Sequence, residues 1–221
     1  MKIQSLGILG LGSRSTLFYI KELNCLYHKQ KGGYNTCPFK MLNANFDAIN
    51  NLLPGTSDDL EILVRNYLDE LVHLKVDAVL IPNITLHETI DKITIRSKII
   101  HPVHLTIEKL KSRDVNKIVL FGSLHTMESG FFKIEFQKEN IEVILPSKTE
   151  RLFIDEVRNH IYEETENEEL LEKFSDIIKK YTDWHAVVLA CTELSIAWNN
   201  VNCNVFDMSR IQIEMAVTNI D

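Results

Sequence analysis

The sequence predicts an α/β protein built from two similar subdomains, each with a mostly parallel β-sheet flanked by helices. Short apolar segments alternate with amphipathic segments of helical period, which is the pattern of parallel βαβ units. Two apolar runs, 76–83 and 184–191, align with each other, and both end abruptly in polar clusters. Two glycine-containing strand ends, 8–13 and 119–123, match at a similar offset, which pairs Gly12 with Gly122.

Each element follows from local periodicity and turn residues. Strands are expected at 3–9, 39–43, 76–81, 99–103, 117–121, 142–145, 186–190 and 204–206. Helices are expected at 13–26, 58–74, 87–97, 105–110, 126–139, 150–164, 168–181, 193–198 and 207–216. The segments 29–37 and 50–57 are expected to be loops or turns. The halves are residues 1–104 and 105–207, and the chain from 208 to 221 can return to the first.

Composition narrows the function. The formal net charge is −7 and no basic stretch stands out, so a nucleic-acid partner is not expected. No apolar run approaches the roughly 18 residues that span a bilayer, and no signal peptide precedes the first strand, so we expect a cytoplasmic protein without membrane partners. The four cysteines fit no zinc spacing, there is no Walker A motif, and Gly10-Leu11-Gly12 is an incomplete dinucleotide fingerprint.

The ends of the two matched apolar runs are the candidate reactive positions. Cys191 ends the second run, directly before a short helix, while Asn83 holds the matching position in the first. A cysteine at a helix N-terminus commonly has its pKa lowered to roughly 3.5–7.5, so Cys191 is expected to ionise readily. Backbone N–H groups at such strand ends can bind a carboxylate. Nearby hydroxyls can orient a substrate or simply cap helices, and both roles are compatible: Thr85, Ser123, Thr126 and Thr192.

Seven segments, in order, resemble the aspartate/glutamate racemase superfamily, which includes related decarboxylases and isomerases. The resemblance spans nearly the whole chain and rests on Gly7–Gly10 with Ser15-Thr16, Leu42–Phe46, Pro82–His87, Gly122–Glu128, Leu145–Ser147 with Ile161–Glu164, Ala190–Leu194 and Phe206–Ile211. It implies two pseudo-twofold related subdomains with the active site in the cleft between them. It also implies cofactor-independent racemisation of an amino acid or dicarboxylate by two cysteines, with no metal, in a homodimer.

The resemblance assigns Cys191 and the position of Asn83 to catalysis. It assigns substrate contacts to Ser13, Asn43, Thr85, Ser123, Thr126, Thr192 and Glu193. His87 matches a histidine that the family often has, which suggests a proton relay or an orienting residue. Arg14 is the best candidate to bind a side-chain carboxylate, although a surface charge at a helix start explains it equally well.

Three positions depart from the family pattern. Asn83 replaces the first catalytic cysteine, Ile84 replaces the following asparagine, and Gln212 replaces a late histidine. An amide has no useful proton affinity, so a symmetric two-thiol mechanism cannot operate. Asn83 could instead donate a hydrogen bond to the substrate, and His87, His125 or a water would have to serve as the second acid.

Three functions remain open from the sequence. The first is a racemase or epimerase that uses Cys191 and is strongly asymmetric between enantiomers. The second is a catalytically inactive member that binds an amino acid. The third is a one-cysteine decarboxylase of a substituted malonate, in which Cys191 protonates the carbanion left by CO₂.

Overall fold

The structure, a computed structural model, describes residues 2–220 and divides the chain into two compact units. Unit 1 is the chain up to His101 together with the part from Gln212 on, and unit 2 is Pro102–Ile211. The boundaries expected from the sequence, at 104 and 207, lie a few residues from these. Within residues 2–220, no helix combines the length and the apolar character that crossing a membrane requires.

Unit 1 is built on four strands: β1 (Leu6–Gly10), β2 (Phe39–Asn43), β3 (Ala78–Leu80) and β4 (Lys98–Ile99). Their order in the sheet is β2-β1-β3-β4, and every pairing is parallel. The direction in which the chain adds strands reverses between β1 and β3. In open parallel sheets, ligands bind beyond the carboxyl ends of the strands at such a reversal.

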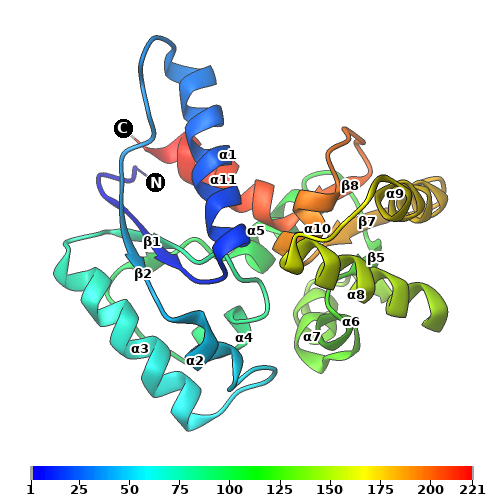
Figure 1. The fold of residues 1–221 in the computed structure, drawn as a ribbon, viewed down its shortest axis with the longest axis horizontal. Helices are drawn as coiled ribbons and strands as arrows, with labels where there is room; N and C mark the ends of the chain where they lie inside the picture. Colours follow the sequence, from blue (N-terminus) through cyan, green and yellow to red (C-terminus); the bar gives the residue numbers. More distant parts are fainter. Residues whose placement is uncertain (1, 221) are drawn as a thin grey trace. The chain divides into compact units, whose positions relative to one another are not determined.

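Helices cover both faces of this sheet, as parallel strands require. The helices of unit 1 are α1 (Ser13–Lys31), α2 (Phe46–Asn50), α3 (Asp58–His73), α4 (His87–Ile90) and the end of α11 (Met208–Asn219). One face packs Leu9 and Val79 against the apolar side of α3. The alternate strand residues Ile8 and Leu80 are fully buried as well. Figure 1 shows α3 in cyan on one side of β1, and α1 in blue with α11 in red on the other.

Unit 2 repeats the plan with β5 (Lys117–Phe121), β6 (Glu142–Ile144), β7 (Ala186–Leu189) and β8 (Val205–Asp207). The order is β6-β5-β7-β8, again with parallel pairings throughout, so the reversal lies between β5 and β7. The two units therefore each have a four-stranded parallel sheet with the same strand order, which confirms the predicted α/β fold class.

The helices of unit 2 also lie on both faces of its sheet. They are α5 (Pro102–Lys111), α6 (Leu124–Glu128), α7 (Gly130–Lys138), α8 (Lys148–Glu163), α9 (Glu168–Thr182) and α10 (Thr192–Ala197). Helices α8 and α9 pack their apolar sides, including Val157 and Phe174, against Val119 and Val187 of the sheet. Figure 1 shows these two helices side by side. Helices α5 and α7 contact each other, and they also contact β8 and β6 respectively.

Two helix predictions were wrong in extent. The helix expected at 87–97 ends at Ile90, because the following residues return to the sheet edge, where Ser97 Oγ donates to Val76 O at 2.6 Å. The helix expected at 126–139 is two helices separated at Ser129. Ser129 has extended backbone angles, and its hydroxyl caps α7 by accepting from Phe131 N.

Other differences lie at element ends. The strand expected at 3–9 is β1 (Leu6–Gly10), since Ile3 forms an isolated bridge with Ile220 instead. The strand expected at 99–103 is the short β4, because Pro102 opens α5, where its missing N–H costs nothing. Part of the expected loop 29–37 is the last turn of α1, and α2 was not predicted. The remaining elements agree with the predicted ends to within a few residues.

Candidate active site

The reversal in each sheet places two strand ends side by side. In unit 1 these are the ends of β1 and β3, and we call the residues around them (Gly10, Thr16, Asn83, Thr85 and His87) the Asn83 site. In unit 2 they are the ends of β5 and β7, where Ala190 N donates to Phe121 O at 2.7 Å. We call the residues there the Cys191 site: Gly122, Ser123, Thr126, Cys191, Thr192 and Glu193.

Strand register fixes how the first strands of the two units correspond. Ile8 of β1 lies opposite Leu80 of β3, and Leu120 of β5 lies opposite Val188 of β7. Asn83 is the third residue after Leu80, and Cys191 is the third residue after Val188. Leu80 and Val188 are therefore equivalent positions in the two units. Ile8 of β1 therefore corresponds to Leu120 of β5.

This register corrects the predicted match of Gly12 with Gly122. Gly10 is the residue that corresponds to Gly122, since each is the second residue after its reference position, Ile8 or Leu120. A Cβ would be crowded at both positions: on Gly10 it would lie 2.5 Å from Asn43 Oδ1 and 3.2 Å from Thr16 Cγ2, and on Gly122 it would lie 2.7 Å from Thr126 Cγ2. In each unit a threonine thus packs over the strand-end glycine. Thr16, which belongs to the first segment of the resemblance, is farther from its glycine in the sequence than Thr126 is from Gly122.

Asn83 in unit 1 caps the turn that leads into α4. Its Oδ1 accepts a hydrogen bond from Leu86 N at 2.9 Å, and the residue is half-buried. Because the amide oxygen is used in this way, the amide NH₂ is the part of the side chain that remains to donate to a ligand. Thr85, two residues on, is also half-buried.

His87 is tied to the backbone of Asn83 and is fully buried. Its Nδ1 lies 2.9 Å from Asn83 O, and because a carbonyl only accepts, Nδ1 must carry the proton. Burial lowers the pKa of His87 to about 3, and the neighbouring His101 contributes to that lowering. His87 is therefore neutral, and its buried Nε2 has no hydrogen-bond partner within residues 2–220. This geometry fits an orienting role for His87 and gives no proton path through Nδ1.

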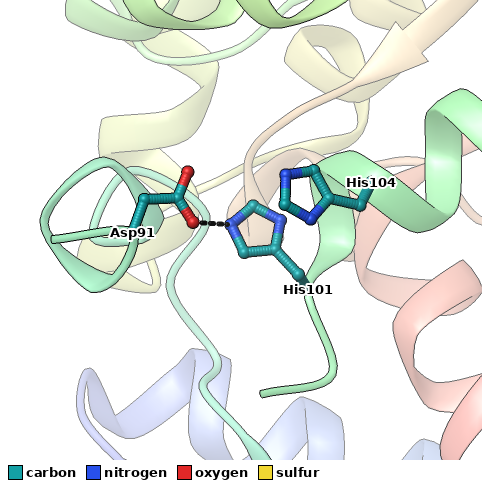
Figure 2. Close-up of side chains that lie close together, drawn as sticks. All are labelled: Asp91, His101 and His104. Atoms are coloured by element: carbon teal, nitrogen blue, oxygen red, sulfur yellow. Dashed lines mark ion pairs between the residues drawn. The ribbon is translucent and has the colours of Figure 1, made fainter. Parts of the chain in front are cut away.

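A second histidine continues this buried group in unit 1. The His101 ring meets the His87 ring edge-on, with centroids 4.7 Å apart. On its other side, His101 Nε2 lies 3.2 Å from Asp91 Oδ1, and Figure 2 shows the carboxylate and the ring facing each other. Asp91 is exposed, so a chain of polar groups leads from the surface of unit 1 to the strand end at Asn83.

Cys191 in unit 2 is the residue directly before α10 and is only 8% exposed. Its Sγ donates to Glu193 Oε2 at 3.0 Å. The single hydroxyl proton of Ser195 is shared between the Cys191 backbone carbonyl, 3.3 Å from Oγ, and Oδ1 of the buried Asp207, 2.8 Å from Oγ. The bonds of Ser195 hold α10 against the end of β8.

The expected ease of ionisation of Cys191 was wrong. Burial raises the pKa of the Cys191 thiol well above its ordinary value, and the charge and hydrogen bond of Glu193 raise it further. The guanidinium of Arg158 and the N–H of Leu194 act in the opposite direction, but they do not outweigh burial. The short α10 helix therefore does not produce a thiolate, and Cys191 is held as a thiol that donates a hydrogen bond.

The hydroxyl side chains of unit 2 also have partners within the protein. Ser123 caps α6 by accepting from Thr126 N at 3.1 Å, and its Oγ lies 2.9 Å from Thr126 Oγ1. Thr192 is buried and accepts from Ser209 Oγ at 3.3 Å. Capping, the plainer of the two roles considered for these hydroxyls, thus describes Ser123, while substrate contact remains a prediction.

The remaining candidates lie at strand and helix ends of unit 1. Ser13 is exposed and begins α1, and Arg14 beside it is half-buried. Asn43 ends β2, and its Oδ1 occupies the space where a Cβ on Gly10 would stand, 2.5 Å away. Thr16 closes this loop by accepting from Leu11 N at 3.0 Å. Ser13 and Asn43 therefore flank the end of β1, and their contact with a substrate stays a prediction.

Two charged residues of α8, the helix that packs against α10, were missed from the sequence. Arg158 on α8 interacts electrostatically with Cys191 and Glu193, and its Nε donates to Asp155 Oδ1 at 2.9 Å. Asp155 Oδ1 also accepts from Leu124 N at 2.9 Å, close to the strand-end glycine. The spacing of Asp155 and Arg158 indicates an i,i+3 pair on one helix. Nothing in the sequence indicates that the helix with this pair packs against the helix that follows Cys191.

Several solved structures superpose on almost the whole chain. A candidate Asp/Glu racemase from Yersinia pestis has a TM-score of 0.82 and 25% identity, over 97% of this chain and 98% of its own. An aspartate racemase homologue from Pyrococcus horikoshii has a TM-score of 0.81 and 20% identity, with the same coverages of 97% and 98%. The Picrophilus torridus aspartate racemase has a TM-score of 0.78 and 17% identity, over 97% of this chain and 93% of its own.

The sequence profile of the Asp/Glu/hydantoin racemase family matches residues 8–216. That range contains both strand-end glycines, Asn83 and Cys191, and it leaves out only a few residues at each end of the 221-residue chain. The fold, the paired strand-end sites and this match agree, and the chain belongs to the Asp/Glu/hydantoin racemase family.

Proposed function

We propose that this protein is an amino-acid racemase or epimerase that works without a cofactor, with Cys191 as its acid–base group and Asn83 in place of a second cysteine. The observation that carries the proposal is Cys191 itself, a strand-end thiol in a chain of racemase family membership. The substrate we propose is a small amino acid or dicarboxylate, because the removed proton must lie beside a carboxylate.

In this proposal the thiol of Cys191 delivers a proton to Cα on one face of the substrate. In the reverse direction the thiol first passes its proton to Glu193, to which it already donates a hydrogen bond, and the resulting thiolate removes the Cα proton. General acid–base groups of this kind commonly contribute about 10²–10⁴-fold to a rate. The N–H groups at the strand ends would stabilise the enolate-like charge.

Asn83 cannot exchange protons with Cα, so we propose that it binds the substrate. Its Oδ1 already accepts a hydrogen bond from Leu86 N, so the NH₂ group is the part of the side chain that would bind the substrate, as a donor. Donation to a substrate carboxylate would orient the substrate and leave the opposite face to a water or another acid–base group. That group removes the Cα proton when Cys191 delivers one, and delivers a proton when Cys191 removes one. The two enantiomers should consequently exchange their Cα protons at strongly unequal rates.

The test is Cα deuterium incorporation, followed by NMR in D₂O with L- and D-aspartate and L- and D-glutamate. The wild-type protein, Cys191→Ala and the control Cys203→Ser should be run in parallel, since Cys203 is an exposed thiol of the same unit. We expect biased exchange that Cys191→Ala abolishes and Cys203→Ser preserves. Exchange with none of the four amino acids would reject this activity toward acidic substrates. Binding of the same amino acids, measured by calorimetry, would then favour an inactive amino-acid-binding member.

A second candidate function, decarboxylation of a substituted malonate, is favoured by the protonated state of Cys191. Loss of CO₂ generates a carbanion without any base, so a single thiol that donates a proton is sufficient. The Asn83 site then needs no proton-transfer group. CO₂ release from aryl- and alkyl-malonates, with retention of a solvent deuteron at Cα, would support this candidate, and its absence with every malonate tried would exclude it.

A further inference from the structure

Three side chains that can ligate a metal ion lie together where β4 leads into α5: Asp91, His101 and His104 (Figure 2). Each offers one ligand atom, a ring nitrogen or a carboxylate oxygen, and these atoms all lie within 4.8 Å of one another. No step of the proposed reaction at Cys191 uses them. The cluster therefore needs an explanation of its own.

The two imidazoles are placed by one continuous stretch of backbone. His101 directly follows Ile100, whose carbonyl accepts a hydrogen bond from Gln212 Nε2. Pro102 then opens α5, so His104 lies in the first turn of that helix, three residues after His101. A short segment that is fixed at the end of β4 therefore presents both rings.

Asp91 supplies an oxygen ligand from the end of α4. It is the residue that ends this helix, and its N–H donates to His87 O at 3.1 Å. Its Oδ1 lies 3.2 Å from His101 Nε2. Zinc binds carboxylate oxygen and imidazole nitrogen at about 2.0–2.2 Å, so two such ligands on one tetrahedral ion lie about 3.4 Å apart. Asp91 and His101 thus already have nearly the spacing that a shared ion requires.

The donor set selects the kind of ion. Two imidazoles and one carboxylate suit Zn²⁺ and the neighbouring first-row transition ions, whereas Mg²⁺ and Ca²⁺ prefer oxygen ligands alone. His101 is buried, and Asp91 and His104 are exposed, so an ion can reach the ring of His101 from solvent. Water would fill the remaining coordination position, as in zinc sites with three protein ligands.

We propose that Asp91, His101 and His104 bind one divalent transition-metal ion, and Zn²⁺ is the ion that we expect. The ion would join the end of α4 to the end of β4. His101 meets the His87 ring edge-on, and His87 Nδ1 binds the Asn83 carbonyl, so the ion would lie at the outer end of the polar chain that leads to Asn83. The site does not depend on the proposed function, since no proton transfer passes through the ion.

The test is calorimetry of Zn²⁺ binding to the full chain after treatment with a chelator, with Co²⁺ as a spectroscopic probe. Cys25→Ser/Cys203→Ser is the background, because exposed thiols also bind these ions. We expect one ion per chain, micromolar or tighter affinity, and a Co²⁺ spectrum without a thiolate charge-transfer band. At 100 times the dissociation constant, Zn²⁺ should raise the melting temperature by about 5–10 °C. Excess Mg²⁺ should not compete.

Loss of any ligand should weaken binding. Asp91→Asn, His101→Gln and His104→Ala should each lower the affinity for Zn²⁺ by about 100-fold or more, since loss of a mere outer-shell partner costs about 10–100-fold. The matched controls are His28→Ala and Asp69→Asn, which remove an exposed imidazole and an exposed carboxylate from α1 and α3. Both controls should stay within about twofold of the background protein.

Three results would overturn the proposal: no binding of Zn²⁺ or Co²⁺ up to about 1 mM, a thiolate band in the Co²⁺ spectrum, or equal affinities for the ligand variants and the controls. Thermal melting checks folding, and exposed His104→Ala keeps the test decisive if buried His101→Gln unfolds. The outcome is separable from the proposed function. Metal binding without Cα exchange would support this inference and reject racemisation of the amino acids tested, and exchange in a protein that binds no metal would do the reverse.

Discussion

The two units tie their strand-end residues down with the same geometry and different chemistry. The fourth residue after Cys191 is Ser195, which donates to the Cys191 carbonyl, and the fourth residue after Asn83 is His87, whose Nδ1 binds the Asn83 carbonyl. A hydroxyl and an imidazole therefore make the equivalent bond in the two units.

The fourth strands complete the comparison. Asp207 ends β8 and precedes α11, while His101 follows β4 and precedes α5. Asp207 accepts from the Ser195 hydroxyl, and His101 meets the His87 ring edge-on. Unit 1 has thus placed two imidazoles where unit 2 has a hydroxyl and a carboxylate.

The comparison distinguishes the side chains that hold the strand-end loops in place from those that can transfer a proton. Both loops keep a side chain bound to the strand-end carbonyl, so the backbone geometry is shared. The groups that can transfer a proton from a strand end are concentrated in unit 2, in the thiol of Cys191 and the carboxylate of Glu193. Unit 1 offers an amide at the matching position and a neutral, fully buried imidazole behind it.

The largest effect is expected when the thiol of Cys191 in unit 2 is removed. Cys191→Ser should reduce Cα exchange by about 10²–10⁴-fold, because a hydroxyl is a far weaker acid–base group than a thiol. The rate is measured by NMR in D₂O with each enantiomer of aspartate and glutamate. The reciprocal variant Asn83→Ala should lose much less of the Cα exchange rate and mainly raise KM. A comparable loss of rate in both variants would mean that both residues take part in proton transfer.

The next largest effect restores a thiol to unit 1. Asn83→Cys should raise exchange of the disfavoured enantiomer by about 10-fold or more, because an acid–base group returns to the second site. The cap on Leu86 N weakens in this variant, so the melting temperature must be measured beside the rate. An unchanged enantiomer bias in a folded variant would contradict the assignment of Asn83 as the substitute for a catalytic cysteine.

The buried tie in unit 2 can be tested by stability. Ser195→Ala removes the donor to Asp207, which is buried, and should lower the free energy of unfolding by about 1–3 kcal/mol. The measurement is urea denaturation at neutral pH. Ser112→Ala is the matched control, because that hydroxyl is exposed and donates to the nearby Lys109 carbonyl. If both variants lose the same small amount, the Ser195–Asp207 bond does not hold α10.

The contact of His87 with the Asn83 carbonyl should make the stability of unit 1 depend on acid pH. The corresponding contact of Ser195 in unit 2 has no imidazole to protonate. The folded pKa of His87 is about 3, below its ordinary value of 6.5, so the unfolded chain binds the extra proton first as pH falls. Stability from a neutral His87 is therefore present above about pH 6.5 and decreases at lower pH, by about 1–2 kcal/mol between pH 6.5 and 5. His87→Gln keeps a donor for Asn83 O and should show a shallower loss. Parallel pH profiles for the two proteins would argue against a neutral, buried His87.

The strand ends could be predicted from the sequence, while the charge state of the site could not. Apolar runs ending in Asn83 and Cys191 are local patterns, and they located both reversal points of the sheets. The ionisation of Cys191 depends on burial and on Glu193 and Arg158, which act through space. The helix N-terminus, which is visible in the sequence, therefore suggested a lowered pKa for Cys191. Burial by long-range packing raises that pKa instead.

The same distinction explains the shifted glycine match. Two glycines near a strand end, Gly10 and Gly12, look equivalent in the sequence, and only the register of β1 on β3 shows that Gly10 takes the crowded position. Likewise, the helix at 87–97 has a helical pattern but ends early, because the chain must return to form β4. Periodicity reports which face of a segment is apolar and carries no information about where the next strand must begin.

The shielding of Cys191 has a consequence for how the protein ages. A thiolate is the form that attacks peroxides and disulfides, so a buried thiol that donates to a carboxylate is oxidised slowly. Cys37 is protected in the same manner, since burial raises its pKa to about 11. Cys25 and Cys203 are exposed, and they should be the first cysteines to be oxidised or to form intermolecular disulfides during storage without reductant. A preparation can therefore become covalently cross-linked while the sulfur that matters for its chemistry is still intact.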